Sequence, residues 1–97
     1  MDKSMKSKLL PSVNHEKRFF ANNGETYANY YELLEGLRAM DSATFYHHVN
    51  GNKNDFMNWV RDVFSDKRLA KEIAKLPWPE ITAKKVEERI KSLQKFI

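Results

Sequence analysis

The hydrophobic residues from Tyr30 onward recur every three or four positions, which is the spacing that one buried face of a helix produces. The pattern predicts five helices, over residues 29–39, 43–49, 53–64, 66–75 and 82–96. The third of these is the most apolar, so we expect it at the centre of the core. The side chains of the first four helices that should face the core are Tyr30, Leu33, Leu34, Leu37, Met40, Phe45, Val49, Phe56, Trp59, Val60, Val63, Phe64, Leu69, Ile73 and Leu76.

Polar residues just before these segments predict where the helices begin, because a side-chain oxygen at the N-cap accepts a hydrogen bond from an amide of the first turn. Two pairs have the spacing of a capping box, in which a polar residue three positions further on also takes part. They are Asn29 with Glu32 and Asn52 with Asp55. The other expected N-caps are Ser42, Ser65 and Thr82.

Three turn signals divide the chain between these elements. Asn23-Gly24, between short aromatic and β-branched runs, predicts a β-hairpin, because both central turn residues need a positive φ. The run from Asn50 to Asn52 should end the second helix, with Asn50 or Gly51 in the left-handed conformation. Pro77 and Pro79 cannot continue a helix, so they end the fourth one and hold the residue between them in an extended turn.

These elements predict a mainly α fold, a compact bundle of four to five short helices with a small N-terminal β-hairpin. We divide the chain into a basic mobile arm over residues 1–16, a hairpin plus helical core over 17–76, and a Pro-Trp-Pro turn with a C-terminal amphipathic helix over 77–97. The arm is rich in lysine and serine and cannot bury enough to offset its ordering entropy.

Composition indicates one folded domain. Leu, Ile, Val and Phe make up about 24% of the 97 residues, above the roughly 20% below which charged chains stay disordered. There is no cysteine, which excludes disulfides and thiolate metal sites. No apolar run is long enough for a membrane span or a signal peptide, so we expect a cytoplasmic protein that does not contact membranes.

His47 and His48, with Asp55 further on, are the only grouping of ligand-type side chains in the sequence. Adjacent histidines on a helix point about 100° apart, and zinc needs three or four converging ligands. We therefore expect no metal and no cofactor. One histidine should be partly buried and hydrogen-bonded to Asp55 or a backbone carbonyl while the other meets water. With Asn52, His48 and Asp55 are predicted to be structural polar residues. No catalytic motif is present, and we expect no enzyme activity and no small-molecule substrate.

Two surfaces are candidates for binding. Trp78, together with the stripe of the last helix, can dock on a protein partner or on a second copy; alternatively Trp78 plugs the end of a helix pair and the stripe closes the domain's own core. That stripe consists of Val86, Ile90, Leu93 and Ile97.

The net charge of +4 leaves room for an anionic partner, so a phosphate-binding face is the second candidate surface. Its cations would be Lys67, Arg68, Lys71, Lys75, Lys84, Lys85 and Arg89. Acidic residues interleave with them, which is also the ordinary composition of a solvated helix face.

The strings F-Y-H-H-V-N, N-D-F-M-N-W-V-R-D-V-F and D-K-R-L-A-K-E-I, in that order, make residues 19–76 resemble a family of small archaeal and bacterial domains of unknown function. Its pattern is F-x-x-H-V-N, then N-D-F-x-x-W-V, then D-x-x-L-A, and the resemblance implies no established activity. It singles out His48, Asn54, Asp55 and Asp62 as polar members of an otherwise apolar pattern. The matching residues are Gly24, Leu33, Leu37, Phe45, His48, Val49, Asn54, Asp55, Phe56, Trp59, Val60, Asp62, Val63, Asp66, Leu69 and Ala70.

The function that we expect from the sequence is that of a non-enzymatic interaction module, docking on a protein or on itself. The alternative is a basic protein associated with DNA or structured RNA. Neither the partner nor the oligomeric state follows from the sequence.

Overall fold

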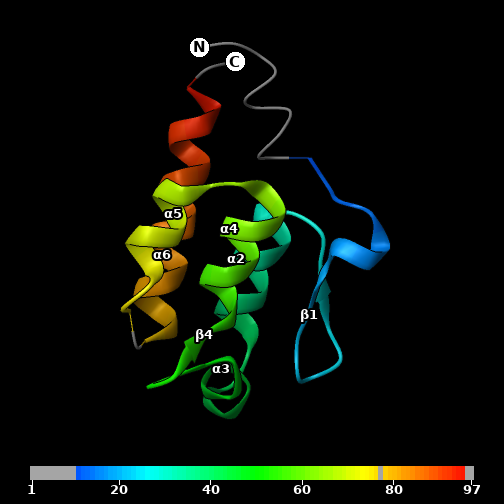
Figure 1. Ribbon diagram of the computed structural model, residues 1–97, viewed down its shortest axis with the longest axis vertical. Coiled ribbons are helices and arrows are strands. Elements are labelled where there is room, and N and C mark those ends of the chain that lie inside the picture. The colour runs from blue at the N-terminus through cyan, green and yellow to red at the C-terminus, as the bar shows by residue number, and fades with distance from the viewer. Residues whose placement is uncertain (1–10, 77, 96–97) are drawn as a thin grey trace.

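The computed structural model describes residues 11–76 and 78–95, and it confirms a mainly α fold with an N-terminal hairpin (Figure 1). A short 3-10 turn, η1, precedes the first strand. The elements are η1 (His15–Lys17), β1 (Phe19–Phe20), β2 (Thr26–Tyr27), α2 (Tyr30–Ala39), α3 (Ser42–His48), β3 (Val49–Asn50), β4 (Lys53–Asn54), α4 (Asp55–Phe64), α5 (Lys67–Ile73) and α6 (Pro79–Gln94).

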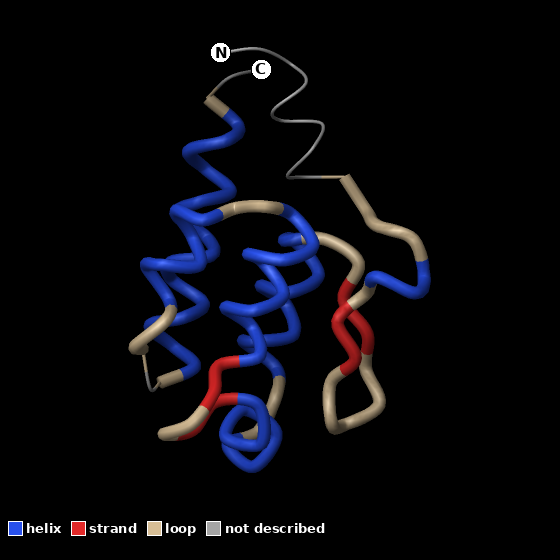
Figure 2. The backbone as a smooth tube through the Cα atoms, in the orientation of Figure 1, coloured by secondary structure: helices blue, strands red, loops and turns tan. Residues whose placement is uncertain are grey.

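The predicted hairpin forms where Asn23-Gly24 places it. Strands β1 and β2 are antiparallel, with Phe19 opposite Tyr27, and Gly24 has a positive φ of 91°. The positive φ that we expected at Asn23 is absent, because residues 21–25 connect the strands and form a longer loop than a two-residue turn. A second hairpin, β3–β4, follows α3 directly and was not predicted (Figure 2). Our expectation of a left-handed helix end at Asn50 or Gly51 is wrong, because the β-branched Val49 is already extended and pairs with Asn54.

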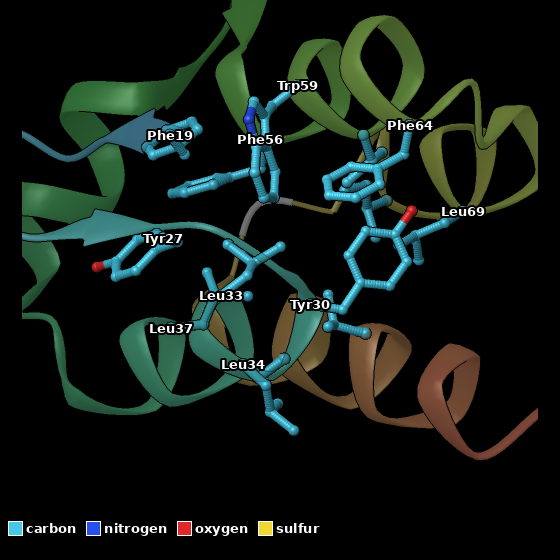
Figure 3. Packing of buried hydrophobic residues seen from close by; sticks show 14 of the residues in the cluster. Phe19, Tyr27, Tyr30, Leu33, Leu34, Leu37, Phe56, Trp59, Phe64 and Leu69 are labelled. Carbon is cyan, nitrogen blue, oxygen red and sulfur yellow. The ribbon is translucent and has the colours of Figure 1, made fainter. Parts of the chain in front are cut away.

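Helix α4 lies near the centre of the view in Figure 1, as its apolar sequence predicts, and it packs on α5, while α6 packs on α2 and α5. Its Phe56 stacks on Phe19 of β1 at 4.7 Å between ring centroids, and this aromatic group continues to Trp59 and Tyr27 (Figure 3). The last helix folds back on α2 and α5, so its stripe closes the domain's own core. Ile97, its predicted final member, lies outside the described residues.

The helices begin at neighbours of several predicted caps. Asn29 caps α2 as predicted, and its side chain accepts a hydrogen bond from the amide of Glu32. Asp41 replaces Ser42 as the cap of α3, and Asp66 replaces Ser65 as the cap of α5, because a carboxylate on the adjacent residue reaches the amide three positions on. Ser65 instead adopts a left-handed conformation with φ of 57°.

The last helix begins earlier than predicted. It starts at Pro79, a residue suited to the first turn because its missing amide hydrogen would have no partner there. Thr82 lies inside the helix and donates a hydrogen bond from Oγ1 to the Trp78 carbonyl.

Contacts cross both of the boundaries that we placed, at residues 16 and 76. Val13 donates a backbone hydrogen bond to Ala28, and Ser12 accepts one from the Asn29 side chain, so this part of the predicted arm is attached to the core. Residues 1–10 and the predicted helix breaker Pro77 lie outside the described residues. The α6 helix belongs to the same core as α2 and α4.

A buried carboxylate joins three of the helices. Asp66, only 3% exposed, accepts hydrogen bonds from the Tyr30 hydroxyl of α2 (2.7 Å) and from Nε of Arg89 on α6 (3.0 Å). Its other oxygen accepts from Arg89 Nη2 and from the amide of Leu69, which begins α5. Burial and the neighbouring carboxylate raise the pKa of Tyr30, so the phenol stays protonated and donates.

We predict that Asp66→Ala lowers the free energy of unfolding by about 3 to 5 kcal/mol, because it leaves the Arg89 charge and the Tyr30 hydroxyl buried without a partner. Urea denaturation measures this loss. The control Asp62→Ala, at an exposed position of α4, should change it by less than about 0.5 kcal/mol. Adding Arg89→Met to Asp66→Ala should recover part of the loss; purely additive effects of the two changes would contradict the role of the buried pair.

Candidate functional site

His48 is the buried histidine, and both nitrogens of its ring are hydrogen-bonded within the domain. Nε2 accepts a hydrogen bond from the backbone amide of Asn22 (2.9 Å), so Nδ1 carries the ring proton and donates it to Asp55 (2.9 Å). The ring packs on Phe19, with 4.9 Å between centroids. His47 is exposed, which answers the question that the sequence left open.

Asp55 lies between two hydrogen-bond donors at the start of α4. Its Oδ2 accepts from His48 and also from the ammonium group of Lys53 on β4 (3.0 Å). Burial alone would raise the pKa of Asp55, but the hydrogen bonds from His48 and Lys53 and the charge of Lys53 together lower it. The carboxylate therefore joins α3, β4 and α4, which supports our interpretation of His48 and Asp55 as structural residues.

A shallow groove of about 400 Å³ lies over this network, between β1 and α4. Three of the four polar residues that the resemblance singled out line it, namely His48, Asp55 and Asp62, together with Arg18. Asp62 is paired with Arg61 at 2.8 Å. Through its bonds to Asn22 and Asp55, His48 holds the loop of hairpin β1–β2 against α3 and the start of α4.

Asn54, the fourth polar residue that the resemblance singled out, is buried and caps α4, a role that we predicted for Asn52. The Asn54 side chain accepts a hydrogen bond from the amide of Met57, which caps α4, and donates one to the carbonyl of Ile73 (2.9 Å). Asn52 is exposed in the turn, where its amide donates to the Asn50 side chain. The predicted capping box of Asn52 with Asp55 is therefore wrong, because strand β4 separates Asn52 from the helix.

No protein-family model, curated protein or solved structure matches the chain. The resemblance drawn from the motif string stays a prediction, and the candidate sites depend on geometry alone.

Within the part of the chain that the structure describes, no group of three histidine or acidic side chains could hold a metal ion. No described helix is both long enough and apolar enough to cross a membrane.

Trp78 is exposed and does not plug a helix pair. Trp78 is the N-cap residue of α6 and is 54% exposed. Ile81, one turn further along the helix, is 40% exposed. A groove of about 420 Å³ runs between the end of α2 and the start of α6, and its lining includes Pro79 and Glu80, the two residues between Trp78 and Ile81 in the chain. We call this region, with Trp78, Ile81 and the groove, the Trp78 surface. The groove is lined by four apolar residues, Leu37, Met40, Pro79 and Ala83, and by four charged ones, Arg38, Glu80, Lys84 and Glu87.

The rest of the predicted protein-docking surface is not available. Val86, Ile90 and Leu93 are buried in the domain's own core against α2 and α5, so we no longer expect them to contact a partner. The sequence could not decide this point, because a narrow apolar stripe has the same pattern whether it faces its own core or another chain.

The predicted phosphate-binding residues are divided by the structure. Arg89 is only 6% exposed and bound to Asp66, so it is removed from that surface. Arg68 pairs with Glu72 at 3.6 Å and Lys85 with Glu88 at 3.5 Å, which reduces the free positive charge of both helices. The remaining cations are exposed; they are Lys67, Lys71, Lys75 and Lys84.

Sequence reasoning missed two features. Phe20, expected only as a hairpin residue, is exposed beside the groove over His48. Tyr27 is buried with a hydroxyl that has no partner among the described residues. Gly36 in the middle of an amphipathic helix was the available signal for Tyr27, because a helix keeps a glycine at about 1 kcal/mol cost only where something approaches closely.

We predict that Asn54→Ala destabilises the domain by about 2 kcal/mol, because a helix cap and a buried side-chain hydrogen bond are lost together. Asn52→Ala is the matched control in the same turn and should change stability by less than about 0.5 kcal/mol. Thermal denaturation of both variants measures the difference. Equal losses would show that the assignment of the cap to Asn54 is wrong.

We also predict that the contribution of Asp55 to stability is lost at low pH. Because the pKa of Asp55 is lowered in the folded state, its contribution to stability is present above the unfolded-state pKa of about 3.9 and disappears as pH falls through the lower folded value. The free energy of unfolding of the wild type should therefore be about 1 kcal/mol higher than that of Asp55→Asn at pH 7. Denaturation curves from pH 7 to pH 2 should show this difference shrinking below about pH 4; a constant difference would contradict the role of the charge.

Proposed function

We propose that the domain is a non-enzymatic protein interaction module, and that it docks a protein partner through the Trp78 surface. The observation that carries this proposal is the exposure of Trp78 and Ile81 at the start of α6, the helix that forms one side of this groove. Large aromatic side chains at the centre of a contact supply much of the energy of protein association. Exposed apolar residues that are grouped, rather than scattered singly, are typical of interaction sites.

The groove favours a partner that inserts an apolar side chain. Its lining combines apolar residues with charged ones, and two of the charged ones, Arg38 and Glu87, pair with each other at 3.2 Å. A protein interface likewise combines apolar contacts with polar groups whose bonds are satisfied. The bonding of His48 on both ring nitrogens supports a non-enzymatic role, because it leaves this histidine structural.

Binding to DNA or structured RNA is the second candidate. The observation that favours it is the set of exposed lysines on α5 and α6, two helices that contact each other. Phosphate contacts weaken steeply as salt rises, whereas burial of apolar groups does not. Salt dependence therefore separates the two candidates.

We predict that Trp78→Ala leaves the melting temperature unchanged but weakens partner binding about 30-fold, the effect of losing roughly 2 kcal/mol at an aromatic anchor. Sedimentation velocity over a range of concentrations first determines whether the partner is a second copy. A pull-down with the full chain, repeated with Trp78→Ala, then identifies and measures a different protein. Tyr46→Ala, which removes another exposed aromatic residue, is the matched control and should bind normally.

A titration with nucleic acid can contradict the protein-docking proposal. Labelled duplex DNA and a structured RNA are titrated by fluorescence anisotropy at about 50 and 200 mM salt, a range over which phosphate-driven affinity collapses. Micromolar binding that falls with salt, and that is lost when Lys67, Arg68, Lys71 and Lys75 become alanine, would replace the protein-docking proposal with the nucleic-acid one.

A further inference from the structure

A groove lies between hairpin β1–β2 and helix α2, and the charged residues that line it are all acidic. It has a volume of about 680 Å³, and among the described residues that line it are three carboxylates and no cation. Glu25 comes from the hairpin, and Glu32 and Glu35 lie on the facing side of α2. Like charges gathered in one concave site raise the local concentration of an ion of opposite sign.

An unpartnered hydroxyl lies in the same groove. Tyr27 is 4% exposed, its ring is stacked on Phe19, and its hydroxyl points away from the aromatic cluster (Figure 3). The hydroxyl end of the ring lies against α2 at Gly36, where an added Cβ would overlap it. Gly36 lines the groove, so the hydroxyl is directed into its floor. It has no hydrogen-bond partner among the described residues.

This arrangement is unfavourable for the free protein. A buried hydroxyl without a partner loses its hydrogen bonds to water and gains none in return, and native structures keep few such groups without a reason. Burial and the charge of Glu25 raise the pKa of Tyr27, so the phenol is neutral and can both donate and accept. A ligand with an N–H donor would supply the missing bond.

We propose that this groove binds a primary alkylammonium group. The carboxylates of Glu25, Glu32 and Glu35 supply its counter-charge, and the Tyr27 oxygen accepts one of its three N–H donors. Tyr31 lines the same groove, and the Gln94 side chain donates to its hydroxyl at 3.2 Å, so an aromatic ring is available for a cation–π contact.

Binding requires a small local change, because the hydroxyl is covered in the ligand-free protein. Met40 at the end of the groove is the side chain best suited to move, since it is unbranched and only partly buried. The groove shares only Met40 with the lining of the groove at the Trp78 surface. The two proposals can therefore fail separately: loss of partner binding in Trp78→Ala does not bear on ammonium binding.

Three sources can provide the ammonium group: a free polyamine, a lysine of another protein, or the chain's own Lys3, Lys6 and Lys8. The test is an NMR titration of the full chain with spermidine and, separately, with the peptide acetyl-Gly-Lys-Gly-amide. The same peptide with Nε-acetyllysine is the neutral control. Backbone signals of Thr26, Tyr27 and Gly36 should shift with the charged probes and not with the neutral one.

Two variants make the readout specific. Tyr27→Phe removes the unpartnered hydroxyl, so it should raise the melting temperature by a few degrees and weaken binding of the charged probe by about tenfold. Glu35→Gln should weaken binding without changing the fold. Glu88→Gln, which makes the same charge change on α6, is the control and should bind normally.

Preference for spermidine or for the lysine peptide identifies the source. If the full chain binds neither, the variant with Lys3, Lys6 and Lys8 changed to glutamine is titrated, and binding that appears only there assigns the groove to the chain's own lysines. Absence of binding in that variant as well, equal shifts with the acetylated peptide, or a lower melting temperature in Tyr27→Phe would each overturn the proposal.

Discussion

The carboxylate of Asp66 is the contact on which the arrangement of the helices depends. It is buried, it carries the charge that balances Arg89, and it also caps α5 and accepts from Tyr30. Removing two charges from water is costly, so such a pair persists only where further hydrogen bonds satisfy both partners. The bonds of Asp66 to Tyr30, Arg89 and the amide of Leu69 connect α2, α6 and α5 to one carboxylate.

Much of the fold could be predicted because periodicity reports burial directly. The spacing of Tyr30, Leu33 and Leu37 indicates which face of α2 is covered, and the structure buries all three. The start of each helix was less predictable, since Asp41 beside Ser42, or Asp66 beside Ser65, offers two adjacent oxygens and only the backbone decides between them. The β3–β4 hairpin was missed because the polar run from Asn50 to Asn52 was interpreted as the end of a helix, and strands of two residues show no alternation that would have indicated otherwise.

The candidate sites were predictable only where one residue depends on near neighbours. His48 and Asp55 are seven positions apart, and a bond of one histidine to Asp55 was one of two expected arrangements, the other being a bond to a backbone carbonyl; the structure shows that His48 makes the bond to Asp55. Arg89 was placed on the wrong surface because its partner is 23 residues away, and a charge in a basic helix looks the same whether it meets solvent or a buried carboxylate. The groove at Tyr27 lies between a hairpin and a helix. Gly36 was its only signal in the sequence, and the contact of the Tyr27 ring with Gly36 is visible only in the structure.

The bonds of the N-terminal hairpin also bear on the order of folding. Its backbone is held by side chains distant in sequence: His48 accepts from Asn22 across 26 residues, and Trp59 donates to the Lys17 carbonyl across 42. Closing such long loops costs chain entropy before any contact repays it, whereas α4 and α5 are joined by a short connection. Helices α4 and α5 can therefore pair early, and the hairpin, first in the chain, docks only after α3 and α4 have formed. When the protein is synthesised from its N-terminus, the first strands must wait for the middle of the chain.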